Sequence, residues 1–195
     1  MVSKKDRDNE DLILQKAIRG DKEGLEYLVS AYQNLSYTIA VRIVINKEDA
    51  EEVVQDSFMK AFASLSNFRK ASRFSTWLYR IVYNTSLTRI ANKPIPTVDI
   101  DHHFENEQCI SIENQQWDSV RHIERKKYID LALSRLPHED RLIITLHYIG
   151  ELSISEICEI LTMKKSAIKM RLLRGRKQLE TELKTLLKNE AKDLL

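Results

Sequence analysis

The chain has 195 residues, of which 43% are apolar, so it is long enough for one or two small domains with their own cores. Four glycines and three prolines are too few for a turn-rich β-sandwich, and two cysteines cannot form the disulfide framework of a secreted protein. The 31 basic and 29 acidic residues leave a net charge of +2, but they are sorted into blocks along the sequence. We therefore expect an all-α protein in which charge marks the functional surfaces.

Residues 1–91 are predicted to form a first helical domain. Apolar residues recur at helical spacing over about 11–19, 22–45 and 48–65, with breaks at Gly20-Asp21 and Asn46. The third of these helices has one stripe predicted to be buried, made of Val54, Phe58, Ala61 and Leu65. Its exposed stripe consists of Glu48, Glu52, Gln55 and Met59. An acidic stripe does not bind nucleic acid, so it is either a solvated face or a docking surface for a protein.

A fourth helix is predicted from an N-cap at Ser72 to about residue 90. Its inward positions are Phe74, Leu78, Ile81 and Thr85. The neighbouring stripe alternates cation, aromatic and amide, in the order Arg73, Trp77, Arg80, Asn84 and Thr88. Such a stripe suits unstacked bases, because base–aromatic stacking is worth about 1–3 kcal/mol per base. Trp77 as a core residue is an equal alternative.

Residues 92–124 are predicted to be a flexible linker, since they contain Pro94 and Pro96 and lack helical periodicity. The linker has no Lys or Arg from residue 99 to residue 118, where its acids are Asp99, Asp101, Glu105, Glu107, Glu113 and Asp118. Residues 125–195 are predicted to form a second helical domain.

The second domain follows a helix-turn-helix plan. A helix over about 125–135 is broken at Leu136-Pro137, and the next helix starts over residues 138–140 and ends at a turn at Gly150. Ser153 and Glu156 have capping-box spacing for a short helix, whose predicted buried face is Ile154, Ile157, Cys158 and Leu161. After a turn at residues 162–164, the final helix repeats Ile168, Leu172, Gly175 and Leu179 along its inner line.

The final helix is strongly basic: residues 164–177 contain seven Lys or Arg and no acid. Opposite its inner line lie Ser166, Met170, Leu173 and Lys177, flanked by Lys169 and Arg174. In a major groove, the cations would neutralise phosphates and the outer side chains would touch base edges. A solubilising helix is the alternative, but the preceding capped helix and turn favour nucleic-acid binding.

Other classes of protein receive less support from the sequence. The histidines at 102, 103, 122, 138 and 147 lack zinc-site spacing, and no Gly-rich phosphate loop or nucleophile elbow is present, so we expect no metal, no cofactor and no enzyme. The start of the chain lacks the apolar core of a signal peptide, and no stretch reaches about 20 apolar residues, which predicts a soluble protein of the reducing cytoplasm. An ordinary helix-turn-helix regulator would leave the acidic stripe and the stripe of Trp77 unexplained.

Two groups of motifs carry a family resemblance. The first group resembles region two of bacterial extracytoplasmic-function (ECF) sigma factors. It consists of the runs EDAEEVVQDSF at 48–58, LSNFR at 65–69 and TWLYRI at 76–81, followed by Asn84. The second group resembles region four of the same family. It consists of the pair Leu136-Pro137 and the runs LSISEI at 152–157, IKMR at 168–171 and RGR at 174–176. Both groups occur in the family's order and cover most of the chain.

The resemblance implies three interfaces. It implies that the β′ clamp helices of core RNA polymerase dock on Asp49, Glu52, Gln55, Asp56 and Met59. It implies that the −10 element is read as a single strand, with a flipped base, by Lys60, Asn67, Phe68, Arg69, Arg73, Trp77, Arg80 and Asn84. It implies that the −35 duplex is bound by Lys165, Ser166, Lys169, Met170, Arg171, Leu173, Arg174 and Lys177, in a region four that also touches the β flap.

The resemblance also bears on the linker, on promoter choice and on control. It implies that the linker threads the active-site cleft and the RNA exit channel, where its acids would mimic nascent RNA, with a plain tether as the alternative. Ser166-Ala167 and Met170 depart from the family's usual Gly-Thr and small residue, which affects the −35 sequence preferred. ECF sigma factors are commonly held inactive by an anti-sigma factor, often anchored in a membrane, and we expect such an inhibitor here.

Overall fold

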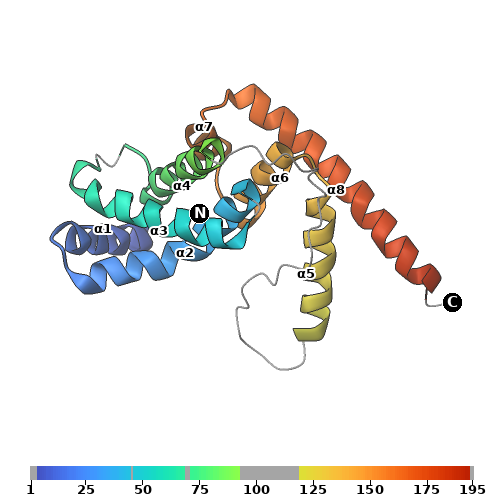
Figure 1. Ribbon diagram of the computed structural model, residues 1–195, viewed down its shortest axis with the longest axis horizontal. Helices are drawn as coiled ribbons and strands as arrows, with labels where there is room; N and C mark the ends of the chain where they lie inside the picture. Colours follow the sequence, from blue (N-terminus) through green and yellow to red (C-terminus); the bar gives the residue numbers. More distant parts are fainter. Residues whose placement is uncertain (1–3, 45, 69–70, 93–118, 194–195) are drawn as a thin grey trace. The chain divides into compact units, whose positions relative to one another are not determined.

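The computed structural model describes residues 4–44, 46–68, 71–92 and 119–193 (Figure 1). Within these ranges the regular secondary structure is helical and contains no strand, which confirms the all-α prediction. Proximity of Cα atoms groups the chain into two compact units, residues 1–93 with 155–162, and residues 94–154 with 163–195. The sequence instead predicts that 155–162 belongs with the helix that follows it. Most of the predicted linker lies outside the described residues, including its six acids.

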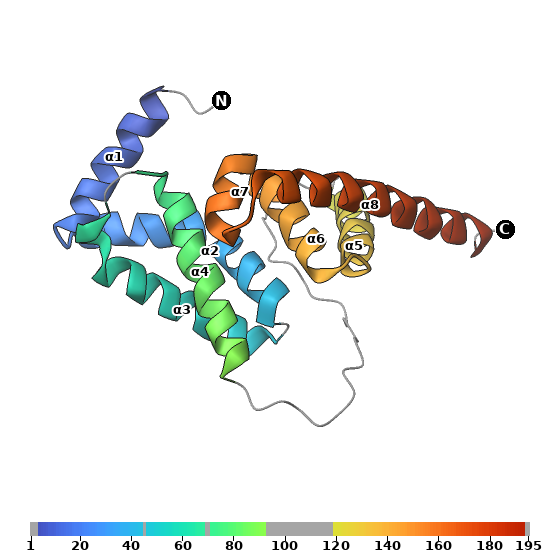
Figure 2. The same cartoon turned by 90° about the horizontal axis from the view of Figure 1, so that it is seen from above.

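The first unit is built on a bundle of helices. These are α1 (Lys4–Ile18), α2 (Lys22–Val44), α3 (Lys47–Ala63) and α4 (Phe74–Ala91), with a short 3₁₀ turn, η1 (Leu65–Asn67), after α3. Helices α2, α3 and α4 pack against one another, and α1 packs on α2 (Figure 2). The side chains at the centre of this packing are fully buried, among them Leu28, Ile39, Val53, Leu78 and Val82. The first helix begins seven residues earlier than predicted.

Two glycines shape the junction of α1 and α2. Gly20 has φ +81°, a conformation that other residues rarely adopt, and it ends α1 as predicted. Gly24 lies where α2 meets the last turn of α1: a Cβ at this position would be 2.8 Å from the backbone nitrogen of Ala17. Farther along, the Tyr32 hydroxyl donates a 2.7 Å hydrogen bond to Glu10, and its burial is the main cause of a raised pKa. The two helices are thus held at close range.

The boundaries and faces of α3 and α4 differ from the prediction in three details. Asn46 does not simply end α2; it caps α3, since its side chain accepts a 2.8 Å hydrogen bond from the backbone N–H of Asp49. The buried line of α3 includes Val53 and Ser57, whereas Val54 is only partly buried. Ser72 is not the N-cap of α4, because the backbone is still extended at Arg73 and becomes helical at the buried Phe74.

The second unit contains α5 (Ser119–Ser134), α6 (His138–Ile144) and α8 (Lys165–Asp193), and α5 and α6 both pack on α8. Helix α5 begins six residues inside the predicted linker. Pro137 precedes α6 as predicted, because proline fits the start of a helix. Helix α6 continues into a π-helical turn, η2 (Thr145–Ile149), which the sequence did not predict and which ends at Gly150.

Helix α7 (Ile154–Leu161) and α8 follow each other as helix, turn, helix. The buried side chains of α7 are Ile157, Ile160 and Leu161; Ile154 and Cys158, predicted to be buried, are only partly covered. The turn between the helices contains Thr162 at φ +56°. The inner line of α8 was predicted correctly, since Ile168, Leu172 and Gly175 are buried and Leu179 is half-buried.

Candidate functional site

The acidic face of α3 is exposed as the sequence predicts. All four members of the stripe, Glu48, Glu52, Gln55 and Met59, are exposed, and so is Asp56. Met59 has 64% of its surface accessible, so the stripe contains an apolar side chain available to a partner. Four of the five side chains predicted to bind polymerase are therefore accessible along α3, with the apolar Met59 at the C-terminal end of the set.

Asp49, the fifth predicted residue, lies elsewhere: it is only 5% exposed. Its Oδ1 accepts hydrogen bonds from Arg89 of α4, 3.0 Å from Nε and 2.9 Å from Nη2. Arg89 also forms an ion pair with Glu52, and the hydrogen bond to Asp49 is the main cause of its raised pKa. Asp49 thus joins the start of α3 to the end of α4 instead of facing outwards. The sequence did not indicate a role for Arg89, because forty residues separate it from Asp49.

The mixed stripe of α4 is also exposed along most of its length. Arg73, Arg80, Asn84 and Thr88 are accessible, and Trp77 is half-buried. The Trp77 ring packs with Phe68 and Phe74, at centroid distances of 5.1 and 5.7 Å. Trp77 therefore belongs to an aromatic cluster and still presents part of its surface to solvent.

An open pocket lies between α3 and α4. It is lined by Lys60, Ser64, Ile81, Asn84, Thr85 and Thr88. Lys60 reaches across it and donates a 3.2 Å hydrogen bond to the Thr85 hydroxyl. The pocket brings together two predicted −10 residues, Lys60 and Asn84, that are 24 positions apart in the sequence. Asn67 is exposed at the end of η1, whereas Arg69 lies outside the described residues.

The outer face of α8 presents most of the predicted −35 residues. The exposed members are Lys165, Ser166, Lys169, Met170, Leu173, Arg174 and Lys177, whereas Arg171 is half-buried. Met170 and Leu173 are 65% and 57% exposed, so apolar and cationic side chains alternate on this face. Beside it, an open pocket extends to Tyr148 of η2, which the sequence analysis did not single out.

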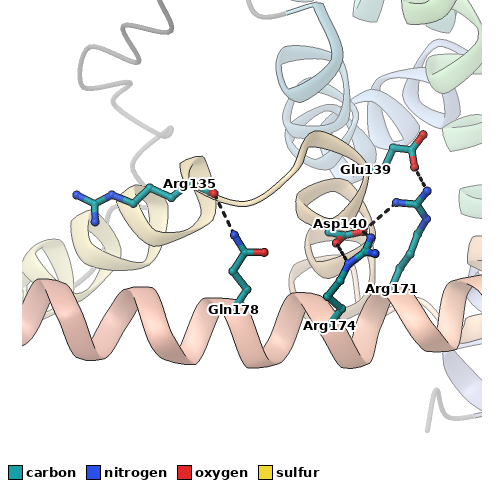
Figure 3. Close-up of polar contacts among 6 residues, drawn as sticks. All are labelled: Arg135, Glu139, Asp140, Arg171, Arg174 and Gln178. Carbon is teal, nitrogen blue, oxygen red and sulfur yellow. Dashed lines mark hydrogen bonds and ion pairs between the residues drawn. The ribbon is translucent and has the colours of Figure 1, made fainter.

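Two of the predicted DNA-binding cations have partners inside the protein (Figure 3). Asp140 of α6 is fully buried and accepts from Arg174 Nε at 2.7 Å, from Arg174 Nη2 at 2.9 Å and from Arg171 Nη1 at 3.0 Å. Arg171 also pairs with Glu139. Burial of Asp140 disfavours its charged form, but the hydrogen bonds from Arg174 and Arg171 outweigh this and hold its pKa below the ordinary value.

Close packing and further polar contacts hold α6 against α8 around this cluster. Gly175 allows the approach, because a Cβ there would lie 3.1 Å from Cγ1 of the buried Ile144. Farther along α8, Gln178 donates to the Arg135 carbonyl at 3.4 Å (Figure 3), and Arg135 pairs with Glu182 at 3.1 Å. In the ranges that the structure describes, no group of three His, Cys, Asp or Glu side chains could hold a metal ion, and no helix is long and apolar enough to cross a membrane.

Comparisons with known proteins assign the chain to a family. The family model of sigma-70 region 2 matches residues 28–93, and that of sigma-70 region 4 matches residues 126–179. The ECF RNA polymerase sigma factor SigW of Bacillus subtilis is 31% identical over 180 residues, which cover 89% of this chain and 96% of SigW. The chain belongs to the ECF sigma factors. The region 2 match contains both the α3 and the α4 surfaces, and the region 4 match contains α6, α7 and the outer face of α8.

Two solved structures agree in fold with this ECF sigma factor. The sigma factor RpoE of Bartonella quintana, solved with the anti-sigma factor NepR, aligns with a TM-score of 0.62 and 24% identity over 82% of this chain and 96% of that one. CnrH, solved with the cytosolic domain of CnrY, aligns with a TM-score of 0.61 and 21% identity over 89% of this chain and 96% of that one. At these identities the likeness concerns the fold alone.

Proposed function

We propose that this ECF sigma factor binds core RNA polymerase through α3, reads a −10 element as a single strand through α4 and binds a −35 duplex through α8. The observation that carries the proposal lies in the first unit. There, α3 presents an acidic surface unsuited to nucleic acid, and the adjacent α4 presents cations, an amide and an indole suited to it. Two packed helices with opposite surface chemistry fit a protein that joins a protein partner to DNA.

The polymerase contact is assigned to Glu52, Gln55, Asp56 and Met59. Exposed acids attract a basic partner over long range, which speeds association, and an exposed apolar side chain supplies burial once the two surfaces meet. The exposed Met59 suits that role because methionine adapts its shape to a partner surface. Asp49 contributes indirectly in this proposal, by fixing α3 through Arg89.

The −10 contact is assigned to the stripe of α4 and to the pocket that adjoins it. Trp77 and Phe68 provide ring surface for stacking, and Arg73 and Arg80 are exposed cations that suit phosphates. The pocket has polar groups from both helices, including Lys60 Nζ and the Asn84 amide, which can hydrogen-bond the edge of an unpaired base. Arg69 and Asn67 complete the proposed set.

The −35 contact is assigned to the outer face of α8. Lys165, Lys169 and Lys177 are exposed cations for phosphates, and Ser166, Met170 and Leu173 lie where base edges would be read. The half-buried Arg171 is the least accessible of the predicted residues. The β flap remains a proposed further partner of region four.

Control by a protein inhibitor is part of the proposal. Both solved structures described above are complexes of two proteins: CnrH with the cytosolic domain of CnrY, and a sigma factor with an anti-sigma factor. The exposed acidic and apolar side chains of α3 offer such an inhibitor the surface that polymerase would use. We therefore propose that the chain is a cytoplasmic sigma factor, which an anti-sigma factor keeps inactive by competing with polymerase. Anti-sigma factors of this family are often anchored in a membrane. No catalytic step is assigned to the chain itself.

Run-off transcription tests the proposed function. Core RNA polymerase is mixed with this chain, free of inhibitor, on a library of promoter fragments from the source genome. We expect discrete transcripts that core enzyme alone does not produce. A matched variant, Met59→Asp, replaces an exposed apolar contact with a charge and is expected to leave α3 helical, so it should abolish those transcripts. Equal transcript patterns with and without the chain would contradict the proposal.

A further inference from the structure

The carboxylate of Asp140 is placed unusually for an acid beside a DNA-binding surface. It is fully buried, and its two oxygens accept three hydrogen bonds from two arginines of α8. A buried acid near DNA would by itself repel phosphate. Its presence beneath the cationic face therefore calls for a role that outweighs this repulsion.

The two arginines are not equivalent. Arg171 is 28% exposed and has a second acidic partner, Glu139, so its charge is balanced within the protein. Arg174 is 62% exposed, although Nε and Nη2 are bonded to Asp140. Its Nη1 makes no hydrogen bond in the described part of the chain. The Arg174 guanidinium is thus held along one edge and has another edge available.

We infer that Asp140 is a positioning residue for DNA binding: it fixes the guanidinium of Arg174 so that the remaining edge meets a backbone phosphate. The guanidinium is planar, so two bonds to one carboxylate determine where its other N–H groups point. A free arginine on a helix surface would lose rotamer freedom on meeting a phosphate, whereas Arg174 has already lost it. The inference rests on the proposed binding of duplex DNA by α8.

Charge and positioning predict opposite results when Asp140 is replaced by its neutral isostere. Asp140→Asn removes a negative charge near DNA, so electrostatics alone predicts tighter binding and a steeper salt dependence. If Asp140 positions Arg174, the variant should bind DNA more weakly. The NH₂ group of Asn then faces an N–H group of Arg174, and one of the two hydrogen bonds that fix the guanidinium is lost. Binding should then weaken about tenfold, which corresponds to the loss of one hydrogen bond between charged groups.

The experiment measures the affinity of the full chain for a short random-sequence duplex across a range of salt concentrations. Asp140→Asn and Arg174→Ala should each weaken binding about tenfold and lower the salt slope by about one unit. The double variant should bind no more weakly than Arg174→Ala, because Asp140 acts through Arg174. Lys169→Ala is the control; its effect should add to that of Asp140→Asn, since the two act on separate phosphates.

Arg174→Lys keeps the inference testable if Asp140→Asn fails to fold, which circular dichroism would reveal. Lysine retains the charge but cannot make the two-point contact, so binding should weaken almost as much as with alanine. Any one of three results would overturn the inference. Asp140→Asn could bind DNA more tightly than the wild type, or Arg174→Lys could bind with unchanged affinity. In the Arg174→Ala background, Asp140→Asn could weaken binding as much as it does in the wild type. If Lys169→Ala and Arg174→Ala both bind like the wild type, the proposed role of α8 itself is wrong.

Discussion

Replacing Thr162 by glycine should stabilise the protein. Thr162 lies in the turn between α7 and α8 with φ +56°, in the left-handed region where a β-branched side chain is strained. That conformation costs an L-residue about 1–2 kcal/mol, whereas glycine adopts it freely. Glycine also loses more conformational entropy on folding, by about 0.5–1 kcal/mol. Because the Thr162 side chain is exposed, no packing is lost, and the net gain should be about 0.5–1 kcal/mol.

Thermal unfolding followed by circular dichroism measures this gain. For a unit of roughly 100 residues, the expected rise in Tm is about 2–5 °C. Thr162→Ala is the matched control: it removes the β-branch but keeps a Cβ at positive φ, so most of the strain should remain. A Tm for Thr162→Gly that equals or falls below the wild-type value would refute the strain argument, and an equal rise in Thr162→Ala would assign the gain to the lost side chain instead.

Three more outcomes are expected. Charge reversal of Glu52 and Asp56 to lysine should weaken binding to core polymerase at least tenfold with unchanged helix content, and a pull-down with unaltered affinity would make these acids a solvated face. Gly24→Ala should lower the free energy of unfolding by about 1–2 kcal/mol despite alanine's better helix propensity, since the new Cβ would lie 2.8 Å from the Ala17 nitrogen; a gain in chemical denaturation would contradict this. Because the folded-state pKa of Asp140 is lowered, its contribution to stability is present above the unfolded pKa of about 3.9 and is lost as the pH falls through the folded pKa. The stability difference between wild type and Asp140→Asn should therefore shrink in acid, and a difference that stays constant from neutral pH to pH of about 2 would exclude this linkage.

Periodicity predicted the helices because most of them bury one face. The inner line of α8 and the exposed stripe of α3 followed from spacing alone, as both repeat over three or more turns. One member of the predicted buried line of α3 was wrong: Val53 is buried where Val54 was predicted, because two adjacent valines fit the pattern equally well. The π-helical turn after α6 was missed since no residue type marks it.

The candidate surfaces were predicted better than the contacts beneath them. Charge sorting located the acidic face of α3 and the basic face of α8, because each lies within one helix. It could not assign Asp49 to Arg89, or Asp140 to Arg171 and Arg174, since these partners are 31 to 40 residues apart. Side chains that the sequence grouped by charge were divided by the fold into those that face solvent and those that hold helices together.

The pairing of Asp49 with Arg89 has a consequence for how this sequence can change over time. Replacing Arg89 alone removes both of its hydrogen bonds to the buried carboxylate of Asp49, and replacing Asp49 alone leaves the half-buried Arg89 with Glu52 as its acidic partner. A paired replacement by two neutral side chains of similar size avoids burying a charge. Positions 49 and 89 should therefore covary among relatives of this chain, while exposed acids such as Glu48 drift independently. The same coupling would limit domain grafting: an α3 taken from another sigma factor would fit this α4 only if it brought an acid to position 49.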